Sequence, residues 1–414
     1  MRFLFVHQNF PGQFRHVANH LAGDPQHTVV GVCDAANLAR SRGMHKRITI
    51  AGYRLAPPPA TAIHPYLQAT QEHVLRAQTA AHAVRQLLAQ GFDADVVVAH
   101  PGWGEALFLR ELLPRARHVH YCEYFYHADG ADVGFDPEFP AHPNDGQRII
   151  VKNATQLLGL PQCDAGIAPT RWQRSLYPQE WRAKIAVLHE GIDTTVVKPD
   201  PLAHMLVDGI PIRAGDEIVT FVARNLEPYR GFHTFMRALA ALQGLRPAAR
   251  VVIVGGDEVS YGRRPPAGLC YRHMYTDEIN RSEIAPRVDW SKVHFLGNVP
   301  YAHFVKVLQV SAVHVYLTYP FVLSWSMLEA MAAGCLLVAS NTHPVQEFIR
   351  DGENGLLVDF FDAAALARTI SQALEQREAL APLRSRARAH IVDQYELTTR
   401  CGPAWVRFLT QPAS

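Results

Sequence analysis

Residues 313–339 read VHVYLTYPFVLSWSMLEAMAAGCLLVA, and this stretch decides the fold class of the chain. It begins with an apolar run at 313–317, passes through a loop into a helical pattern at 326–333, and returns to an apolar run at 336–339. Two short apolar runs separated by a helix are typical of parallel strands that are buried on both faces. Because such crossovers are right-handed, the stretch predicts part of a doubly wound α/β sheet.

The same alternation of apolar runs and helical patterns covers the rest of the chain in two halves. The expected strands of the first half are residues 3–6, 28–32, 95–99, 118–122, 166–168 and 185–188, and its expected helices are residues 13–21, 66–90 and 104–113. The expected strands of the second half are residues 218–223, 250–254, 293–296, 313–317 and 336–339, and its expected helices are residues 231–243, 301–310 and 326–333. Each half therefore predicts a parallel sheet with its own core.

Glycine and proline gather between the two halves, at residues 191–217, where little periodic pattern is left. That composition predicts a linker. We therefore divide the chain into a domain at 1–200, a domain at 201–395 and a C-terminal helix at 396–414 that returns to the first domain. Within the second domain, residues 256–290 are rich in arginine, proline and tyrosine, and they predict a loop with some helix.

The composition narrows the class of protein. Of 414 residues, 48% are hydrophobic and 19% are charged, which is typical of a globular chain. A net charge of +2 gives no general reason to expect a nucleic-acid partner. No segment offers the roughly 20 consecutive apolar residues of a membrane span. The six cysteines have neither zinc-site nor C-x-x-C spacing, so we expect buried, reduced thiols and a cytoplasmic protein, with contact to the inner face of the membrane left open.

Residues able to bind an anion follow two of the expected strands. Gly12 lies in the turn after strand 3–6, where a glycine lets a ligand approach the backbone and the next helix N-terminus favours negative charge. A plain tight turn explains Gly12 equally well. Arg224 and Arg230 flank the turn after strand 218–223, at the edge where open α/β sheets bind ligands. Two guanidinium groups can clamp a diphosphate there, whereas the alternative is a pair of exposed loop arginines.

The loop after strand 313–317 enters a helix at about residues 324–326. Unbonded backbone N–H groups at such a helix start suit phosphate or sugar oxygens. Glu329 follows about one turn into this helix, and its carboxylate can accept hydrogen bonds from a vicinal diol such as a ribose. A glutamate that merely occupies the helix surface is the alternative.

Several segments taken together resemble glycosyltransferase family 4, whose members are retaining enzymes with the GT-B fold. In chain order, the matching segments are His189-Glu190-Gly191-Ile192-Asp193, Val222-Ala223-Arg224 with Arg230-Gly231, VIVGGD at 252–257, HFLG at 294–297, LEAMAAG at 328–334 and DGENGLLV at 351–358. The resemblance covers nearly the whole chain and is strongest over 218–358. It implies two Rossmann-like domains whose parallel sheets face a central cleft, the first on the acceptor side and the second binding the nucleotide sugar.

The chain departs from the family pattern at one of two paired glutamates. Glu329 matches the second glutamate, but Phe321 occupies the position of the first, which the family associates with the donor sugar. Backbone groups at 322–324, or the hydroxyl of Ser324, are candidates to hold the sugar instead. Arg230 stands where the family has a lysine. Glu123 stands where the family often has a histidine, and His100 ends the preceding expected strand; burial in the core is the alternative for both.

The resemblance implies a retaining transfer of a sugar from a nucleotide-diphosphate sugar, without a metal or other cofactor. The catalytic residues would be Arg224 and Arg230, which neutralise the departing diphosphate, together with His100 and Glu123. The donor-binding residues would be Glu329, Val322, Leu323, Ser324 and Gly12.

The acceptor, a glycan, lipid or small molecule, is expected near Gly12, His100 and Glu123. Because Glu123 lies among aromatic residues, we expect its pKa to be raised, so that it exchanges protons near neutral pH. Phe321 leaves an alternative open: a catalytically silent GT-B protein that binds a sugar nucleotide or a partner. A phosphorylase or an epimerase of the same fold is the second alternative.

Overall fold

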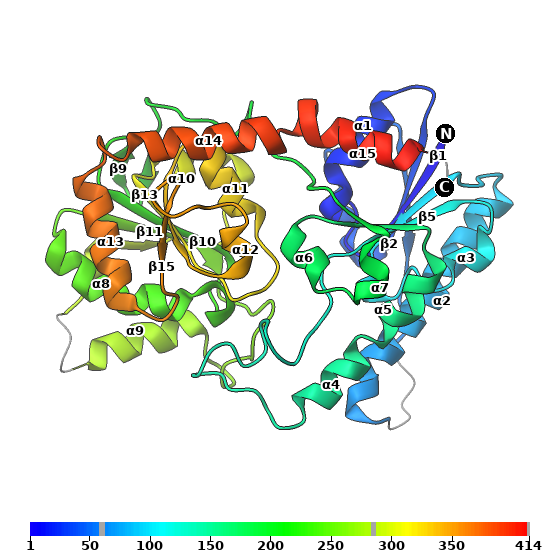
Figure 1. Ribbon diagram of the computed structural model, residues 1–414, viewed down its shortest axis with the longest axis horizontal. Coiled ribbons are helices and arrows are strands. Elements are labelled where there is room, and N and C mark those ends of the chain that lie inside the picture. The colour runs from blue at the N-terminus through cyan, green and yellow to red at the C-terminus, as the bar shows by residue number, and fades with distance from the viewer. Residues whose placement is uncertain (58–62, 283–286, 412–414) are drawn as a thin grey trace. The chain divides into compact units, whose positions relative to one another are not determined.

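The computed structural model describes residues 1–57, 63–282 and 287–411, and the chain forms two compact units (Figure 1). The first unit is Met1–Gly191 together with Leu397–Ser414, and the second is Ile192–Glu396. The C-terminal segment therefore belongs to the first unit, although residues 412–414 lie outside the described part. The boundaries placed from the sequence, after residues 200 and 395, lie close to these.

In the described part of the first unit, seven strands form one parallel sheet in the order β3-β2-β1-β4-β5-β6-β7. The strands are β1 (Arg2–Val6), β2 (Thr28–Asp34), β3 (Ile48–Tyr53), β4 (Val96–Ala99), β5 (Arg117–Tyr121), β6 (Ala165–Ala168) and β7 (Ile185–Val187). Strand β3 was not expected from the sequence. It lies at the sheet edge and buries only Ile48 and Tyr53, so its apolar pattern is weak.

Helices cover both faces of this sheet. They are α1 (Arg15–Gly23), α2 (Gln68–Ala89), α3 (Leu109–Leu112), α4 (Asp145–Lys152), α5 (Ala154–Gly159), α6 (Arg171–Ser175), α7 (Gln179–Arg182) and α15 (Gly402–Thr410). Because successive side chains of a strand point to opposite faces, Phe3 and Phe5 pack against α1 and α15, whereas Leu4 and Val6 pack against α2 and α3. Trp405 of α15 is fully buried in this core, which ties the C-terminal segment to the first unit.

The helix expected at 104–113 is largely wrong. Only α3 forms, and the residues before it make turns. Gly104 itself cannot be helical, because its φ of +97° is left-handed and a Cβ there would lie 2.2 Å from the His73 carbonyl oxygen. A residue with that φ lies outside the α-helical region, so no α-helix runs through Gly104.

In the described part of the second unit, six strands form a parallel sheet in the order β12-β11-β10-β13-β14-β15. The strands are β10 (Ile218–Asn225), β11 (Arg250–Gly256), β12 (Val293–Phe295), β13 (Val313–Tyr316), β14 (Leu336–Ser340) and β15 (Leu356–Val358). The helices are α8 (Phe232–Leu245), α9 (Tyr271–Arg281), α10 (Tyr301–Val310), α11 (Trp325–Ala332), α12 (His343–Gln346), α13 (Ala363–Glu375) and α14 (Ala381–Tyr395). Helices α8 and α13 pack together, whereas α10, α11 and α14 share a separate core cluster with β14 (Figure 1).

The stretch expected to be a linker contains an antiparallel hairpin, β8 (His204–Val207) and β9 (Ile210–Arg213). Its turn is Asp208-Gly209, and both residues have positive φ, at 50° and 78°. Asp-Gly is a strong hairpin turn sequence, so the hairpin was readable from the chain. The expectation of helix within 256–290 is confirmed by α9, although residues 283–286 of that segment lie outside the described part.

Both sheets reverse their strand order at one place. In the first unit the chain runs outward from β1 in one direction and restarts at β4, and in the second unit it runs outward from β10 and restarts at β13. Ligands of doubly wound sheets bind outside the carboxyl ends of the strands at such a switch point. The residues after β1, β4, β10 and β13 are therefore where binding groups belong.

Candidate functional site

Arg230 is the best-held cation at the switch point of the second unit. It ends a 3₁₀ turn, Pro228–Arg230, that follows β10, and it is buried. Its Nη1 donates hydrogen bonds to Thr318 Oγ1 at 2.8 Å and to the Val322 carbonyl oxygen at 2.9 Å, both in the loop after β13. Burial opposes the charge, but Tyr316, Tyr261 and Glu227 hold the pKa of Arg230 above its ordinary value. The switch point therefore contains a permanent, positioned positive charge.

Gly231 makes this position possible. Its φ of +65° is left-handed, and a Cβ on it would lie 2.3 Å from Leu317 Cβ. Only glycine combines that backbone conformation with that close approach. The turn therefore brings α8 directly against the end of β13.

Arg224 is placed quite differently from Arg230. It lies near the end of β10 and is exposed, and its side chain makes no hydrogen bond or ion pair to any residue in the described part of the chain. The structure thus holds one arginine of the expected clamp and leaves the side chain of the other unconstrained. A joint role in binding a diphosphate stays a prediction.

The backbone at the start of α11 is less available than expected. The Ser324 N–H donates to the Tyr316 hydroxyl at 2.9 Å, and the Ser326 N–H donates to Ser324 Oγ at 3.3 Å. The expectation of unbonded N–H groups is therefore wrong for Ser324 and Ser326, because a tyrosine and the N-cap serine bind them. Leu323 is buried, and the Val322 carbonyl faces Arg230.

Glu329 lies on α11 and is buried, where it accepts a hydrogen bond from the Tyr301 hydroxyl of α10 at 2.8 Å. Burial raises the pKa of Glu329 to about 7, although the hydrogen bond from Tyr301 opposes that shift. A ribose-binding role for this carboxylate stays a prediction.

Phe321 is buried in an aromatic cluster beside Arg230. Its ring meets the Tyr229 ring edge-on at 5.4 Å and the Tyr261 ring at 4.9 Å. The Tyr261 ring in turn lies 5.4 Å from the Arg230 guanidinium carbon. An apolar side chain fits position 321 because its neighbours there are aromatic rings.

Glu227 is a residue that the sequence reasoning missed. It is buried, and its carboxylate accepts hydrogen bonds from the backbone N–H groups of Ser260, Tyr261 and Gly262 at 2.9–3.1 Å. These residues belong to segment 256–290, which the sequence predicted as a loop with some helix. Glu227 thereby fixes Tyr261 next to Arg230. No short sequence motif predicts these contacts, because the partners lie 33 to 35 residues away along the chain.

Two histidines face each other at the switch point of the first unit. His7 follows β1 and His100 follows β4, and their rings lie 5.3 Å apart. His7 Nδ1 accepts a hydrogen bond from the Asn9 N–H at 2.8 Å. Burial, with a contribution from His100, lowers the pKa of His7 to about 3, so this ring is neutral. The sequence analysis did not name His7 as a site residue, although a histidine directly after the first strand is a candidate for one.

His100 and Glu123 come together as expected, with Gln13 as a third member. His100 Nδ1 accepts from the Gly102 N–H at 3.1 Å, so Nε2 carries the proton and donates to Glu123 Oε2 at 3.2 Å. Gln13 Nε2 donates to Glu123 Oε1 at 2.6 Å. A Cβ on Gly12 would lie 3.3 Å from the His7 ring, so this glycine adjoins the same group.

The expected raised pKa of Glu123 is wrong. Burial by itself would raise it, but the hydrogen bonds from His100 and Gln13 outweigh burial and hold the pKa of Glu123 below its ordinary value. Donors that bind the charged form of a carboxyl favour ionisation. Glu123 is therefore a carboxylate at neutral pH rather than a proton donor.

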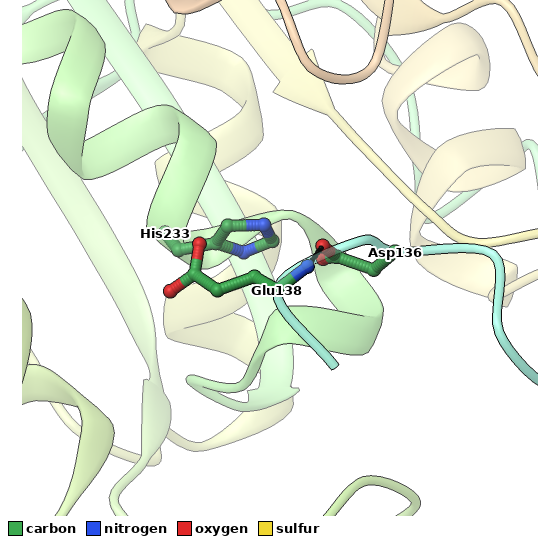
Figure 2. Close-up of side chains that lie close together, drawn as sticks. All are labelled: Asp136, Glu138 and His233. Carbon is green, nitrogen blue, oxygen red and sulfur yellow. Dashed lines mark hydrogen bonds between the residues drawn. The ribbon is translucent and has the colours of Figure 1, made fainter. Parts of the chain in front are cut away.

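The side chains of Asp136, Glu138 and His233 come from different units (Figure 2). Asp136 and Glu138 lie in the first unit between β5 and α4, and His233 lies on α8 of the second unit. The positions of the two units relative to one another are not determined. This group therefore supports no metal site, and metal independence stays a prediction.

Two family models match the chain. A model of the glycosyl transferase family 4 group matches residues 25–197, and a model of glycosyl transferases group 1 matches residues 208–390. The chain belongs to glycosyltransferase family 4. The motifs quoted from residues 218–358 of this family 4 chain lie within the second match.

Curated relatives of this family 4 chain are similar over part of their length. D-inositol 3-phosphate glycosyltransferase of Nocardia farcinica is 29% identical over 259 residues, which are 62% of this chain and 53% of that protein. The protein of the same name from Streptomyces scabiei is 26% identical over 298 residues, which are 70% of this chain and 61% of that protein. The chain thus spans about half the length of these relatives.

Solved structures share the fold of the family 4 chain. Anabaena HepE in complex with UDP-glucose matches with a TM-score of 0.65 at 16% identity, over 99% of both chains. Sucrose-phosphate synthase from Thermosynechococcus elongatus matches with a TM-score of 0.71 at 16% identity, over 99% of this chain and 98% of that one. These matches confirm the predicted GT-B fold class, whereas the facing of the two sheets across a cleft stays a prediction.

No helix within the described residues is both long enough and apolar enough to cross a membrane. The expectations of a cytoplasmic location and of contact with a membrane face stay predictions.

Proposed function

We propose that the chain is a retaining glycosyltransferase that moves a sugar from a nucleotide-diphosphate sugar to an acceptor without a metal ion. Membership of family 4 supports the reaction class. The single observation that supports the donor chemistry is Arg230, a buried guanidinium that Thr318 and Val322 hold at the carboxyl end of β10. A preorganised cation at that place can neutralise the charge that develops on a departing diphosphate.

The donor's remaining contacts follow from the same edge of the second sheet. Arg224 is free to swing onto the diphosphate, and Glu329 accepts hydrogen bonds from the ribose hydroxyls. The hydroxyl of Ser324 is the candidate to bind the sugar, since the Ser324 N–H and the Val322 carbonyl are already hydrogen-bonded. In this proposal Arg230 needs no divalent cation as a partner, because the guanidinium supplies the positive charge itself.

The first unit receives the acceptor in this proposal. Glu123 is ionised, so it accepts a hydrogen bond from the acceptor hydroxyl and orients it, while His100 and Gln13 hold the carboxylate in place. Gly12 leaves the backbone accessible beside His7. The acceptor class, whether glycan, lipid or small molecule, follows from none of these contacts.

Turnover in excess chelator tests the metal-independent part of the proposal. Donor consumption by the purified protein should be undiminished when EDTA exceeds all divalent ions, because no carboxylate pair is assigned to a metal. Complete loss of turnover that returns when Mg²⁺ or Mn²⁺ is added would contradict it. A protein that binds nucleotide sugars but consumes none, with any acceptor offered, would instead be the catalytically silent alternative.

A further inference from the structure

Tyr301 holds the buried carboxylate to which we assign the ribose. Tyr301 is the first residue of α10 and Glu329 lies about one turn into α11, and each helix follows a strand and so begins at the carboxyl edge of the second sheet. The Tyr301 hydroxyl donates a hydrogen bond to Glu329 Oε1 at 2.8 Å. Burial and the charge of Glu329 raise the pKa of this hydroxyl, so it stays protonated and remains the donor.

The other oxygen of Glu329 is open to a ligand. Oε2 accepts no hydrogen bond from any described residue, and the described residues do not enclose it. Only 8% of Glu329 is exposed, whereas 53% of Tyr301 is, so more of the tyrosine than of the carboxylate faces solvent. Glu329 thus offers one oxygen to a ligand while Tyr301 fixes the other.

No positive charge in the described part of the chain compensates this carboxylate. Arg384 and Arg388 of α14, the helix that packs against α11, donate instead to backbone carbonyl oxygens at the C-terminal end of α11. Asp193, which acts on Tyr301, is itself negative. A buried carboxyl without a cation ionises only at higher pH than an exposed one. Burial raises the pKa of Glu329 to about 7, and Tyr301 is the only described group that opposes this shift.

The hydrogen bond and the open oxygen together define a role for Tyr301. Resting on the proposed function, we infer that Tyr301 is a positioning residue for the donor: it holds Glu329 Oε1, so that Oε2 accepts hydrogen bonds from the vicinal hydroxyls of the ribose. A hydrogen bond to an ionised acceptor is about twice as strong as one to a neutral acceptor. Donor binding therefore strengthens as the pH rises and Glu329 ionises. Tyr301 lowers the pH at which this happens, because its hydroxyl favours the charged form of the carboxyl.

The test compares two ligands that differ only in the ribose hydroxyls. Whichever of UDP, GDP and ADP binds is titrated calorimetrically from about pH 6 to about pH 8.5, and so is its 2′,3′-dideoxy counterpart. A terminal phosphate titrates near pH 6, but it does so in both ligands, so the ratio of the two dissociation constants reports the hydroxyls alone. The advantage of the ligand with both hydroxyls should grow at least about fivefold over this range, with a midpoint near pH 7.

Three variants separate Tyr301 from other causes of a pH dependence. Tyr301→Phe removes the hydroxyl but keeps the ring, and it should move the midpoint up by about one pH unit, since one hydrogen bond to an ionised group is lost. Glu329→Gln cannot ionise, so its ratio should not depend on pH. His303→Gln removes an exposed histidine from the same helix and should leave the midpoint unchanged, although histidines titrate in this range.

The outcomes separate the inference from the proposed function. The inference is overturned, while the proposed function stands, if the ratio of the wild type does not change with pH or if Tyr301→Phe leaves the midpoint in place. Binding of dTDP alone, which lacks the 2′-hydroxyl, overturns it in the same way. Failure of every nucleoside diphosphate to bind overturns the proposed function itself.

Discussion

Arg224 and Arg230 show what a sequence can and cannot say about a single residue. Their places after an apolar strand predicted that both lie at the ligand edge of a sheet, and both do. Nothing in the sequence distinguishes Arg230, which is buried against Thr318 and Val322, from Arg224, which is exposed. The burial of Arg230 depends on contacts with the loop after β13, which lies about 90 residues further along the chain.

Arg230→Ala is predicted to lower kcat/KM for the nucleotide sugar roughly 30- to 1,000-fold. This corresponds to a loss of about 2–4 kcal/mol of transition-state stabilisation, because a preorganised charge partner is lost. Arg224→Ala should also lower it. The two variants should differ in stability: Arg230→Ala lowers the thermal midpoint, since it removes buried hydrogen bonds, and Arg224→Ala leaves it unchanged. Activity within threefold of the wild type in both variants would remove the arginines from the site.

The sequence identified Glu123 as a candidate site residue from its place after a strand, but it did not predict the charge state of the carboxyl group correctly. The sequence analysis placed His100 near Glu123 but did not show that His100 and Gln13, from 23 and 110 residues away, donate hydrogen bonds to its carboxylate. These donors reverse the direction of the pKa shift. The role of Glu227 was not predicted for a similar reason, because its hydrogen-bond donors lie in an irregular loop that contains no recognisable motif.

Glu123→Gln is predicted to lower turnover at least about tenfold while nucleotide binding changes little. The pKa of Glu123 is below its ordinary value of 4.5, so the stability that its ionised form supplies is complete above about pH 4.5 and is lost as the pH falls further. The difference in thermal midpoint between wild type and variant should therefore shrink from pH 7 to pH 4.

A purely structural Glu123 would give a different pair of results: a lower thermal midpoint at pH 7 with turnover nearly intact among the folded molecules. Both quantities are measured on the same preparation. Normal turnover would exclude Glu123 from the reaction.

At the scale of elements, the central strands were predictable and the exceptions have local causes. Strands such as β4 and β10 are apolar on both faces because helices cover both sides of the sheet. The edge strand β3 buries too little to show this pattern, and the left-handed backbone of Gly104 keeps that residue out of the expected helix. The β8–β9 hairpin was missed because its glycines and prolines also suit a linker, although the Asp208-Gly209 turn indicates a hairpin.

Gly231→Ala tests whether the turn that positions Arg230 depends on a left-handed residue. The left-handed conformation costs an alanine about 1–2 kcal/mol, and overlap with Leu317 adds to that cost. We therefore expect at least about 2 kcal/mol of destabilisation in chemical denaturation. Gly244→Ala is the matched control, since Gly244 lies within α8 with open space around it, and it should stabilise by about 0.4–1 kcal/mol. A neutral Gly231→Ala would refute this account of the turn.

At the scale of the whole molecule, the sequence predicted two α/β halves, and the structure gives each half the same strand order around its own switch point. That order was not readable from the chain, because periodicity shows which segments are strands and not which strands are neighbours. The switch points explain why the chemistry-bearing residues follow β1, β4, β10 and β13 in particular. The family 4 motifs quoted from the second half surround one of them.

The most direct test of the central claim is a calorimetric titration of the purified chain with UDP, GDP, ADP and dTDP in excess EDTA. We predict that at least one nucleoside diphosphate binds at a single site with a dissociation constant below about 1 mM, and that Arg230→Ala weakens it at least tenfold, or about 1.4 kcal/mol. Absence of binding by all four, or binding that Arg230→Ala leaves unchanged, would contradict the account.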